Sequence, residues 1–369
     1  MKKSKLDLIL LFAVIMISLF GVMMIYSSSS IWAEYKFNNP YKYLITQSVF
    51  LVVGTILMII ISKISYTYYL DKANTLLFGC FVLLILVIIP GIGTVRNGSR
   101  SWFGIGGFGI QPSEFMKLAM IVFVSKYLYK NNKDIKNIKK GILPILGVTL
   151  FAFGLIMLQP DFGTGVILVM SIIGLLFISG VNMKFFLILG IFGVIGATLL
   201  IIIAPYRFQR ILSFLNPWLD PLGTGFQAIQ SLFAIGPGGL LGLGLGNSIQ
   251  KHFYLPEPQT DFIFSIISEE LGFLGIIIVS ALFLTIIYRG IKISLNSRDL
   301  FSKYLSFGII FQISFQALLN LMVVVGLIPI TGVTLPFLSY GGSSLLSYML
   351  IVGILLNISL KKSTTYKYR

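Results

Sequence analysis

The sequence contains little cysteine, little histidine and few charged residues, and each shortage excludes a class of protein. Cys80 is the one cysteine among 369 residues, so the chain cannot form an internal disulfide. His252 is the one histidine, and HExxH and CxxC patterns are absent, so zinc chemistry has no support. The phosphate-binding loop and GxSxG patterns are absent as well, which leaves nucleotide hydrolysis and serine hydrolysis without support.

Apolar residues are abundant instead. They make up 56% of the chain, charged residues make up 11%, and the mean hydropathy is +0.94. A soluble protein of this length cannot bury so much apolar surface, so the composition predicts a protein that crosses a membrane several times. The formal net charge of +16 could indicate nucleic-acid binding. Basic residues in short loops between spans are the commoner cause of such a charge, and we expect no nucleic-acid partner.

Apolar runs of about 18 or more residues recur along the chain, each long enough to cross a hydrocarbon core of about 30 Å. We therefore predict an all-α polytopic membrane protein with about ten transmembrane helices, forming a single transmembrane domain over residues 1–369. The first apolar run is longer than the core of a signal peptide, which is about 7–15 residues, so we expect it to be the first span. The predicted spans are 7–27, 45–62, 75–91, 112–128, 142–159, 163–180, 184–204, 262–288, 304–327 and 341–359.

The distribution of Lys and Arg predicts the orientation of these spans. Most of the 28 basic residues fall on one side of the bundle if both termini are cytoplasmic, and the loop 126–141 is the most basic of that side. The other side carries two long loops, 92–111 and 205–261, which contain most of the Trp, Pro and Gly outside the spans. Such glycine density suits short or re-entrant helices, and long loops on a rigid bundle are where function is expected.

Three carboxylates lie at the start of the span that begins near residue 262. Asp261 is at its mouth, and Glu269 lies about 12 Å deeper at a helical rise of about 1.5 Å per residue, with Glu270 beside it. Asp261, Ser265 and Glu269 share one helical stripe, so the helix presents a polar seam. Charged groups at this depth need partners or a polar cavity. The sequence leaves open whether they line a site or form a structural ion-pair network.

A second group of polar residues surrounds the first long loop. Glu114 and Lys117 are three residues apart on one helix face, which favours a structural ion pair or the lining of a cavity. Asp161, in LQPDFGTG, could cap a turn or belong to a site. Arginine forks match phosphate oxygens, and the candidates are Arg100, Arg207 and Arg210, with Trp102 as a nearby aromatic surface. From the residues alone we expect an outward-facing polar cavity for an amphiphilic anionic substrate, in either an enzyme or a transporter.

Several motifs resemble those of the SEDS family of cell-shape, division and sporulation proteins. They are SSSSIWAEYKFNN, RSWFGIGGFGIQPSEFMKLA, QPDFGT, GPGGLLGLGLGNSIQKHFYLPEPQTDFIFSIISEELGFLG and LPFLSYGGSS, which together cover nearly the whole chain. YLPEPQTDFIF and IWAEYKF are closer to the FtsW/SpoVE branch than to RodA. The resemblance implies a peptidoglycan glycosyltransferase that polymerises lipid II on the outer membrane face, with a class B penicillin-binding protein transpeptidase as partner.

The resemblance also assigns roles to residues. The essential acidic residue of the family corresponds to Asp261, its loop tryptophan to Trp102, its paired helix charges to Glu114 and Lys117, and the acidic residue of its QPD turn to Asp161. Asp261 is then either a general base or a ligand of a divalent cation, Mg²⁺ or Mn²⁺, and no organic cofactor is expected. Substrate contacts are expected from Trp102, Arg100, Arg207, Arg210, Asp161 and Ser265. The alternatives are a lipid II flippase and a non-catalytic scaffold for division or sporulation enzymes.

Overall fold

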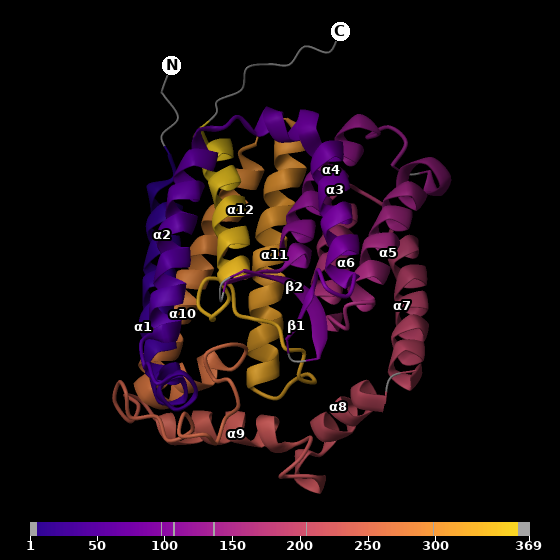
Figure 1. The fold of residues 1–369 in the computed structure, drawn as a ribbon. Coiled ribbons are helices and arrows are strands. Elements are labelled where there is room, and N and C mark those ends of the chain that lie inside the picture. The colour runs from indigo at the N-terminus through magenta and orange to yellow at the C-terminus, as the bar shows by residue number, and fades with distance from the viewer. Residues whose placement is uncertain are drawn as a thin grey trace.

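A computed structural model describes residues 6–96, 98–105, 108–135, 137–203, 205–297 and 299–360, without the side chains of residues 105, 108, 200 and 205–207. Long helices stand side by side as a bundle, and shorter elements gather toward one end of it (Figure 1). We call this end, which carries residues 94–110 and 205–261, the loop end. The opposite end, where the described chain starts and finishes, is called the basic end.

Each of the predicted spans coincides with a helix, so the predicted fold class is confirmed. Within the described residues, eight helical segments are long and apolar enough to cross a membrane. Two further spans are also helical: α6 has 17 residues, and α4 carries several charged side chains. The helices are α1 Leu8–Phe37, α2 Lys42–Lys63, α3 Tyr66–Ile88, α4 Pro112–Lys130, α5 Leu143–Met157 (preceded by a π-helical turn, η1, Ile138–Ile142), α6 Phe162–Ile178, α7 Met183–Ile203, α10 Ile263–Leu295, α11 Leu300–Val324 and α12 Gly342–Leu360.

Helix α1 is longer than predicted, because it continues ten residues beyond the predicted end of the first span. The serines after Tyr26 resemble a loop in the sequence, but their hydroxyls are satisfied within the bundle. Ser27 donates to Glu270 at 2.6 Å, and Ser29 donates to the carbonyl of Ile25 at 2.6 Å. The helix ends where Asn38 adopts a left-handed conformation with φ of 52°.

The first long loop differs from the prediction. Residues 92–111 were expected to contain short or re-entrant helices, but their described part forms a three-stranded antiparallel sheet with the order β1–β2–β3. The strands are β1 Thr94–Arg96, β2 Ser99–Ile105 and β3 Phe108–Ile110, with Val95 paired to Arg100 and Gly104 to Gly109. Alternating polar and aromatic residues with glycine turns favour strand pairing here over helix.

The second long loop contains short helices, as predicted. They are α8 Pro205–Leu215, a 3-10 turn η2 Pro217–Leu219, α9 Phe226–Ile235 and a second 3-10 turn η3 Gly236–Gly238. Figure 1 shows α8 and α9 lying across the loop end of the bundle, outside the long helices. The hydroxyl of Ser231 on α9 donates to the carbonyl of Val324 at 2.8 Å, which attaches α9 to the end of α11.

The segment after α9 is joined to α10 through backbone hydrogen bonds. Gly272 interrupts the helix with φ of 60° and ψ of −151°. The amides of Phe273 and Leu274 donate to the carbonyls of Gly239 and Leu240, at 2.9 and 3.2 Å. In return, the amides of Leu243 and Gly244 donate to the carbonyls of Glu269 and Glu270, at 2.9 and 3.0 Å. The loop thus replaces two helical hydrogen bonds of α10, in the same way that a strand pairs with its neighbour.

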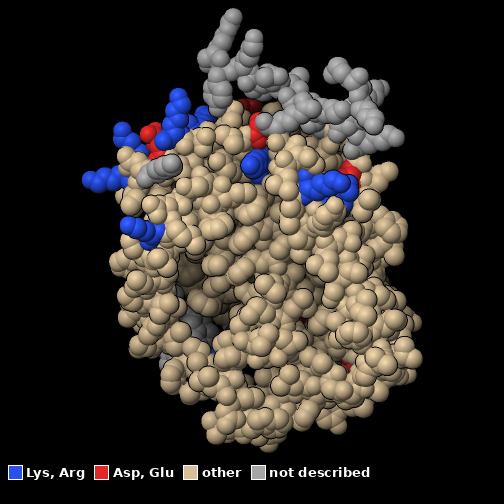
Figure 2. Space-filling view, turned by 180° about the vertical axis from the view of Figure 1, so that it is seen from behind, with Lys and Arg blue, Asp and Glu red and all other residues tan. Residues whose placement is uncertain are grey.

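Interactions at the basic end connect the two ends of the described chain. The amide of Asp7 donates to Ser359 at 3.2 Å, and the carboxylate of Asp7 pairs with Arg289 of α10 at 2.6 Å. Figure 2 shows Lys and Arg side chains gathered toward this end, above a broad surface with almost no charge. This uncharged surface is what a helical bundle presents to lipid.

Candidate active site

Asp261 lies at the loop end, two residues before α10 begins. Its Oδ1 accepts a hydrogen bond from the hydroxyl of Thr260 at 2.9 Å. Its backbone carbonyl accepts from Asn320 of α11 at 2.7 Å, and the same amide group donates to the carbonyl of Val333 at 2.7 Å. Asn320 therefore fixes the backbone of Asp261 to two other parts of the bundle, and the residue as a whole is partly buried.

The surroundings of Asp261 raise the pKa of its carboxyl group toward neutral pH. Burial raises the pKa of Asp261 from 3.8 to about 6, and the charge of Glu257 adds to this rise. The hydroxyl of Thr260 and the charge of Arg210 oppose it. Arg210, on the exposed face of α8, also donates to the carbonyl of Ile330 at 3.1 Å. A carboxylate with this pKa can accept a proton near neutral pH.

The small sheet carries a cationic and aromatic pair whose charge reaches the segment before α12. The guanidinium of Arg96 lies 5.1 Å from the ring centroid of Trp102, and its charge also acts on Tyr340. The amide of Tyr340 in turn donates to the carbonyl of Gln259 at 2.8 Å, two residues before Asp261. The structure thus connects the Trp102 region to Asp261 through Arg96 and Tyr340. Arg100 is half-buried on β2, next to Gly93.

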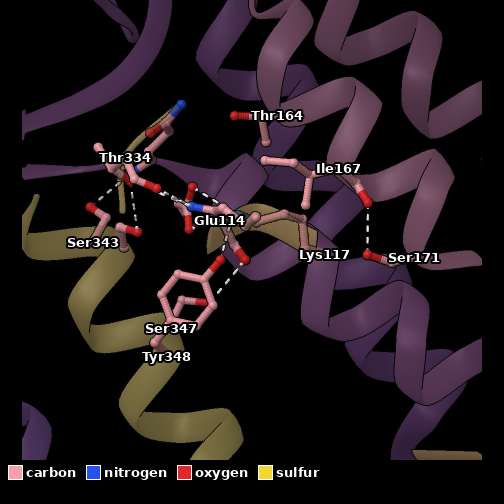
Figure 3. A network of polar contacts seen from close by, with 12 residues as sticks. Glu114, Lys117, Thr164, Ile167, Ser171, Thr334, Ser343, Ser347 and Tyr348 are labelled. Atoms are coloured by element: carbon pink, nitrogen blue, oxygen red, sulfur yellow. Dashed lines mark hydrogen bonds and ion pairs between the residues drawn. The ribbon is translucent and has the colours of Figure 1, made fainter. Parts of the chain in front are cut away.

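Glu114 and Lys117 form an ion pair inside the bundle (Figure 3). The ammonium group of Lys117 lies 3.1 Å from both oxygens of Glu114 and donates to Gln316 of α11 at 2.9 Å. The hydroxyl of Tyr348 on α12 donates to the same oxygen of Gln316. Lys117 is 1% exposed, so this network connects α4, α11 and α12 without contact with solvent.

Asp161 caps α6 and also contacts the segment after the sheet. Its Oδ1 accepts from the amide of Thr164 at 3.1 Å, and its Oδ2 accepts from the side chain of Gln111 at 2.8 Å. Burial raises the pKa of Asp161, and the nearby charge of Glu114 adds to this rise. Asp161 therefore lies beside the Glu114–Lys117 pair, on the side of the loop end.

Glu269 and Glu270 are buried by the segment that pairs with α10. Glu269 accepts from the amide of Ile249 at 2.8 Å and from the hydroxyl of Ser248 at 2.5 Å. Glu270 pairs with Lys251 at 3.1 Å. Both carboxylates are at most 1% exposed, so they hold residues 248–251 against α10 and do not line an open cavity.

Comparisons with known proteins identify the fold. A family model for cell cycle proteins, FtsW, RodA and SpoVE, matches residues 7–364. The chain belongs to this FtsW/RodA/SpoVE family. Stage V sporulation protein E of Bacillus subtilis (strain 168) is 51% identical over 358 residues, which is 97% of this chain and 98% of the relative. A probable peptidoglycan glycosyltransferase FtsW of Geobacter metallireducens is 39% identical and covers 97% of this chain and 96% of its own.

Solved structures agree with this membership of the FtsW/RodA/SpoVE family. One such chain belongs to a peptidoglycan synthase complex that coordinates polymerization and crosslinking. It superposes on this chain with a TM-score of 0.78 at 31% identity. It covers 96% of this chain and 97% of that one. The rod shape determining protein RodA of Thermus thermophilus superposes with a TM-score of 0.71 at 27% identity, over 96% of each chain.

Of the expected substrate contacts, one is placed differently by the structure and the side chain of another is not described. Ser265 does not face an open cavity, because it is fully buried and shares a hydrogen bond of 2.8 Å with Ser231 of α9. Its position fixes α9 and explains the polar stripe without a ligand. The side chain of Arg207 lies outside the described residues.

The sequence reasoning missed the amide side chains of α11. Gln312, Gln316 and Asn320 recur every four residues in an apolar helix, so they lie on one face. Gln316 contacts the ion pair and Asn320 contacts the Asp261 backbone. Buried amides in a membrane span need partners, and this spacing was the available signal.

Proposed function

We propose that this chain is a peptidoglycan glycosyltransferase that polymerises lipid II into β-1,4-linked glycan at the outer face of the bacterial cytoplasmic membrane. The observation that carries the proposal is Asp261, a partly buried residue at the loop end whose carboxyl group has a pKa of about 6. Family membership and the relatives that are named as peptidoglycan glycosyltransferases support the same activity.

The reaction joins two sugars and releases a lipid pyrophosphate. The 4-hydroxyl of the acceptor N-acetylglucosamine attacks the anomeric carbon of the donor N-acetylmuramic acid, and the bond from that carbon to the pyrophosphate oxygen breaks. Asp261 accepts the proton of the attacking hydroxyl, and undecaprenyl pyrophosphate leaves with the electron pair. Attack opposite the leaving group inverts an α-linked donor into a β-linked product.

The charge that develops on the leaving pyrophosphate needs stabilisation. Arg210 lies close enough to Asp261 for its charge to act there, and its guanidinium suits phosphate oxygens. Arg100 and Trp102 are further substrate contacts from the sheet, and we keep Asp161 as a contact on the side of the ion pair. Among the residues that the structure describes, Arg210 is the candidate with a shown electrostatic effect on Asp261.

A divalent cation is the alternative role for Asp261. Described residues contain no group of three or more His, Cys, Asp or Glu side chains that could hold a metal. The donors near Asp261 are the carboxylate of Glu257 and the hydroxyl of Thr260, and such oxygen donors suit Mg²⁺ or Mn²⁺. When bound, such an ion would neutralise part of the pyrophosphate charge.

We further propose that the loop end faces the outside and that both termini are cytoplasmic, because Lys and Arg gather at the basic end. The partner is a class B penicillin-binding protein transpeptidase, which crosslinks the strands that this chain makes. A related chain occurs in a complex for polymerization and crosslinking, which supports such a pairing. Division and sporulation proteins are further partners, in agreement with the names of the relatives.

Labelled lipid II tests this proposal directly. We expect the purified protein and its transpeptidase partner, in detergent, to convert lipid II into long glycan strands. Movement of lipid II across liposome membranes without polymer would indicate a flippase instead. If neither polymer nor movement occurs, the chain acts as a scaffold and the proposed activity is wrong.

A further inference from the structure

An aromatic cluster at the loop end has no role in the proposed reaction. It comprises residues at the end of α1, at the start of α2, in the loop 249–262 and just before α12. We call these residues the aromatic track: Trp32, Tyr35, Phe37, Tyr43, Phe253 and Tyr340.

The rings of the aromatic track contact one another in sequence. Phe253 packs edge-to-face against Trp32 and Tyr35, with centroid distances of 5.6 and 5.4 Å. Phe37 contacts Tyr43 at 5.9 Å, and Tyr43 contacts Tyr340 at 4.8 Å. Lys36 lies between these two groups of rings, because its ammonium is 5.5 Å from the Trp32 ring centroid and 5.7 Å from the Phe37 ring centroid.

The track leads to the catalytic carboxylate. The amide of Tyr340, its last member, donates to the carbonyl of Gln259 at 2.8 Å, two residues before Asp261. The charge of Glu257 acts on both Tyr43 and Asp261, so this carboxylate lies near the track as well as near the site. Tyr340 therefore joins the track to the backbone segment that carries Asp261.

The first two rings of the track lie past the predicted apolar part of α1. Helix α1 continues ten residues past the predicted end of the hydrocarbon span, which is about 15 Å at a rise of about 1.5 Å per residue. Trp32 and Tyr35 lie in this extension of α1, and Tyr35 is 78% exposed.

The chemistry of the surface matches a glycan strand. Flat aromatic faces suit the apolar faces of sugar rings, and tyrosine hydroxyls can bond their hydroxyl and acetamido groups. Lys36 and Lys42 add positive charge, with Lys42 only 3.1 Å from the Phe37 ring centroid. Peptidoglycan strands carry carboxylates on their stem peptides, so the charge of these two lysines is complementary to that of the strand.

We propose that the aromatic track binds the growing glycan strand next to the bond-forming site and keeps it attached between additions. This inference rests on the proposed polymerase function. Its consequence is that the track determines how long the strands become, while Asp261 determines whether a bond forms.

Two measurements test the track. In an Asp261→Asn background, which separates binding from catalysis, full-length protein in detergent is titrated with chitohexaose, a soluble β-1,4-linked N-acetylglucosamine oligomer. We expect Tyr35→Ala with Phe253→Ala to weaken binding about tenfold, equivalent to about 1.4 kcal/mol. With Asp261 restored, the same two substitutions should shorten the strands made from lipid II, while the rate of lipid II consumption stays within about twofold.

Tyr288→Ala is the matched control, because Tyr288 is also an exposed tyrosine, at 61% against 78% for Tyr35, and lies near the basic end of α10. Chitohexaose affinity and strand length that equal those of the control would overturn the proposal. The proposal would also be overturned if the strands were shortened only with the transpeptidase present and regained their length at saturating partner, because the track would then be a protein-docking surface. Absence of polymer from the unsubstituted protein would refute the polymerase function instead, and the binding measurement would still test the track.

Discussion

At the scale of single residues, the surroundings of Asp261 connect its chemistry to pH. Burial raises the pKa of this carboxyl group to about 6, so a measurable fraction is protonated just below neutral pH. A base must be ionised to accept a proton. Polymerisation should therefore be constant above pH 7, fall to about half near pH 6 and to about a tenth near pH 5. Initial rates at saturating lipid II measure this profile, and a rate that stays constant from pH 7 to 5 would exclude Asp261 as the base.

Lys117 gives a second residue-scale prediction. It is buried with Glu114, so Lys117→Met leaves an uncompensated charge among apolar helices. We expect the free energy of unfolding to fall by about 3–5 kcal/mol. Thermal unfolding in detergent measures the loss, and Lys130→Met, on the exposed end of the same helix, is the control. The double substitution Glu114→Gln with Lys117→Met should recover part of the loss. If Lys117→Met unfolds at the same temperature as Lys130→Met, the ion pair does not stabilise the bundle as described.

At the scale of elements, the junction between the loop and α10 depends on glycine. A Cβ on Gly272 would lie 2.4 Å from the amide nitrogen of Gly242 and 2.6 Å from the carbonyl oxygen of Gly238. The backbone conformation of Gly272 is also one that side chains avoid. We expect Gly272→Ala to cost about 3 kcal/mol or more and to release the 239–244 segment.

Limited proteolysis of the 239–251 region and thermal unfolding measure this effect. Gly79→Ala is the control, because Gly79 lies in α3 with open space around it. That change should be neutral or stabilising by about 0.5–1 kcal/mol. If both variants unfold alike, the junction does not hold α10 as described.

The elements also show which features a sequence can reveal. Hydropathy predicted each span, because length and apolar content are local properties. The end of α1 was missed because Ser27 is satisfied by Glu270, which is distant in sequence. The sheet in 92–111 was missed because glycine-rich stretches suit several backbones. For the site, the sequence placed Asp261 at the start of a helix but did not point to Asn320. Only the packing of α11 brings the amide of Asn320 to Asp261.

At the scale of the whole molecule, orientation can be measured independently of activity. The charge distribution predicts that Tyr35 faces outside and Lys140 faces the cytoplasm. In a Cys80→Ser background, Tyr35→Cys in intact cells should react with a membrane-impermeant maleimide. Lys140→Cys should react only after permeabilisation. The reverse pattern would place the loop end inside and contradict the proposed location of catalysis.

The central claim is that the carboxylate of Asp261 performs the bond-forming step. Because the pKa of Asp261 in the folded protein lies above 3.8, ionisation of Asp261 lowers the stability between about pH 3.8 and pH 6, and this loss persists at neutral pH, so Asp261→Asn should be no less stable than the parent there. An inactive variant would therefore still be a folded one. Asp71→Asn makes the same chemical change at an exposed position near the basic end.

Polymerisation of labelled lipid II by the parent, Asp261→Asn and Asp71→Asn proteins, each with the transpeptidase partner, is the most direct test. The proposed mechanism predicts long strands from the parent and from Asp71→Asn, and a loss of at least about a hundredfold in rate for Asp261→Asn. Strands formed by folded Asp261→Asn protein at the parental rate would contradict it.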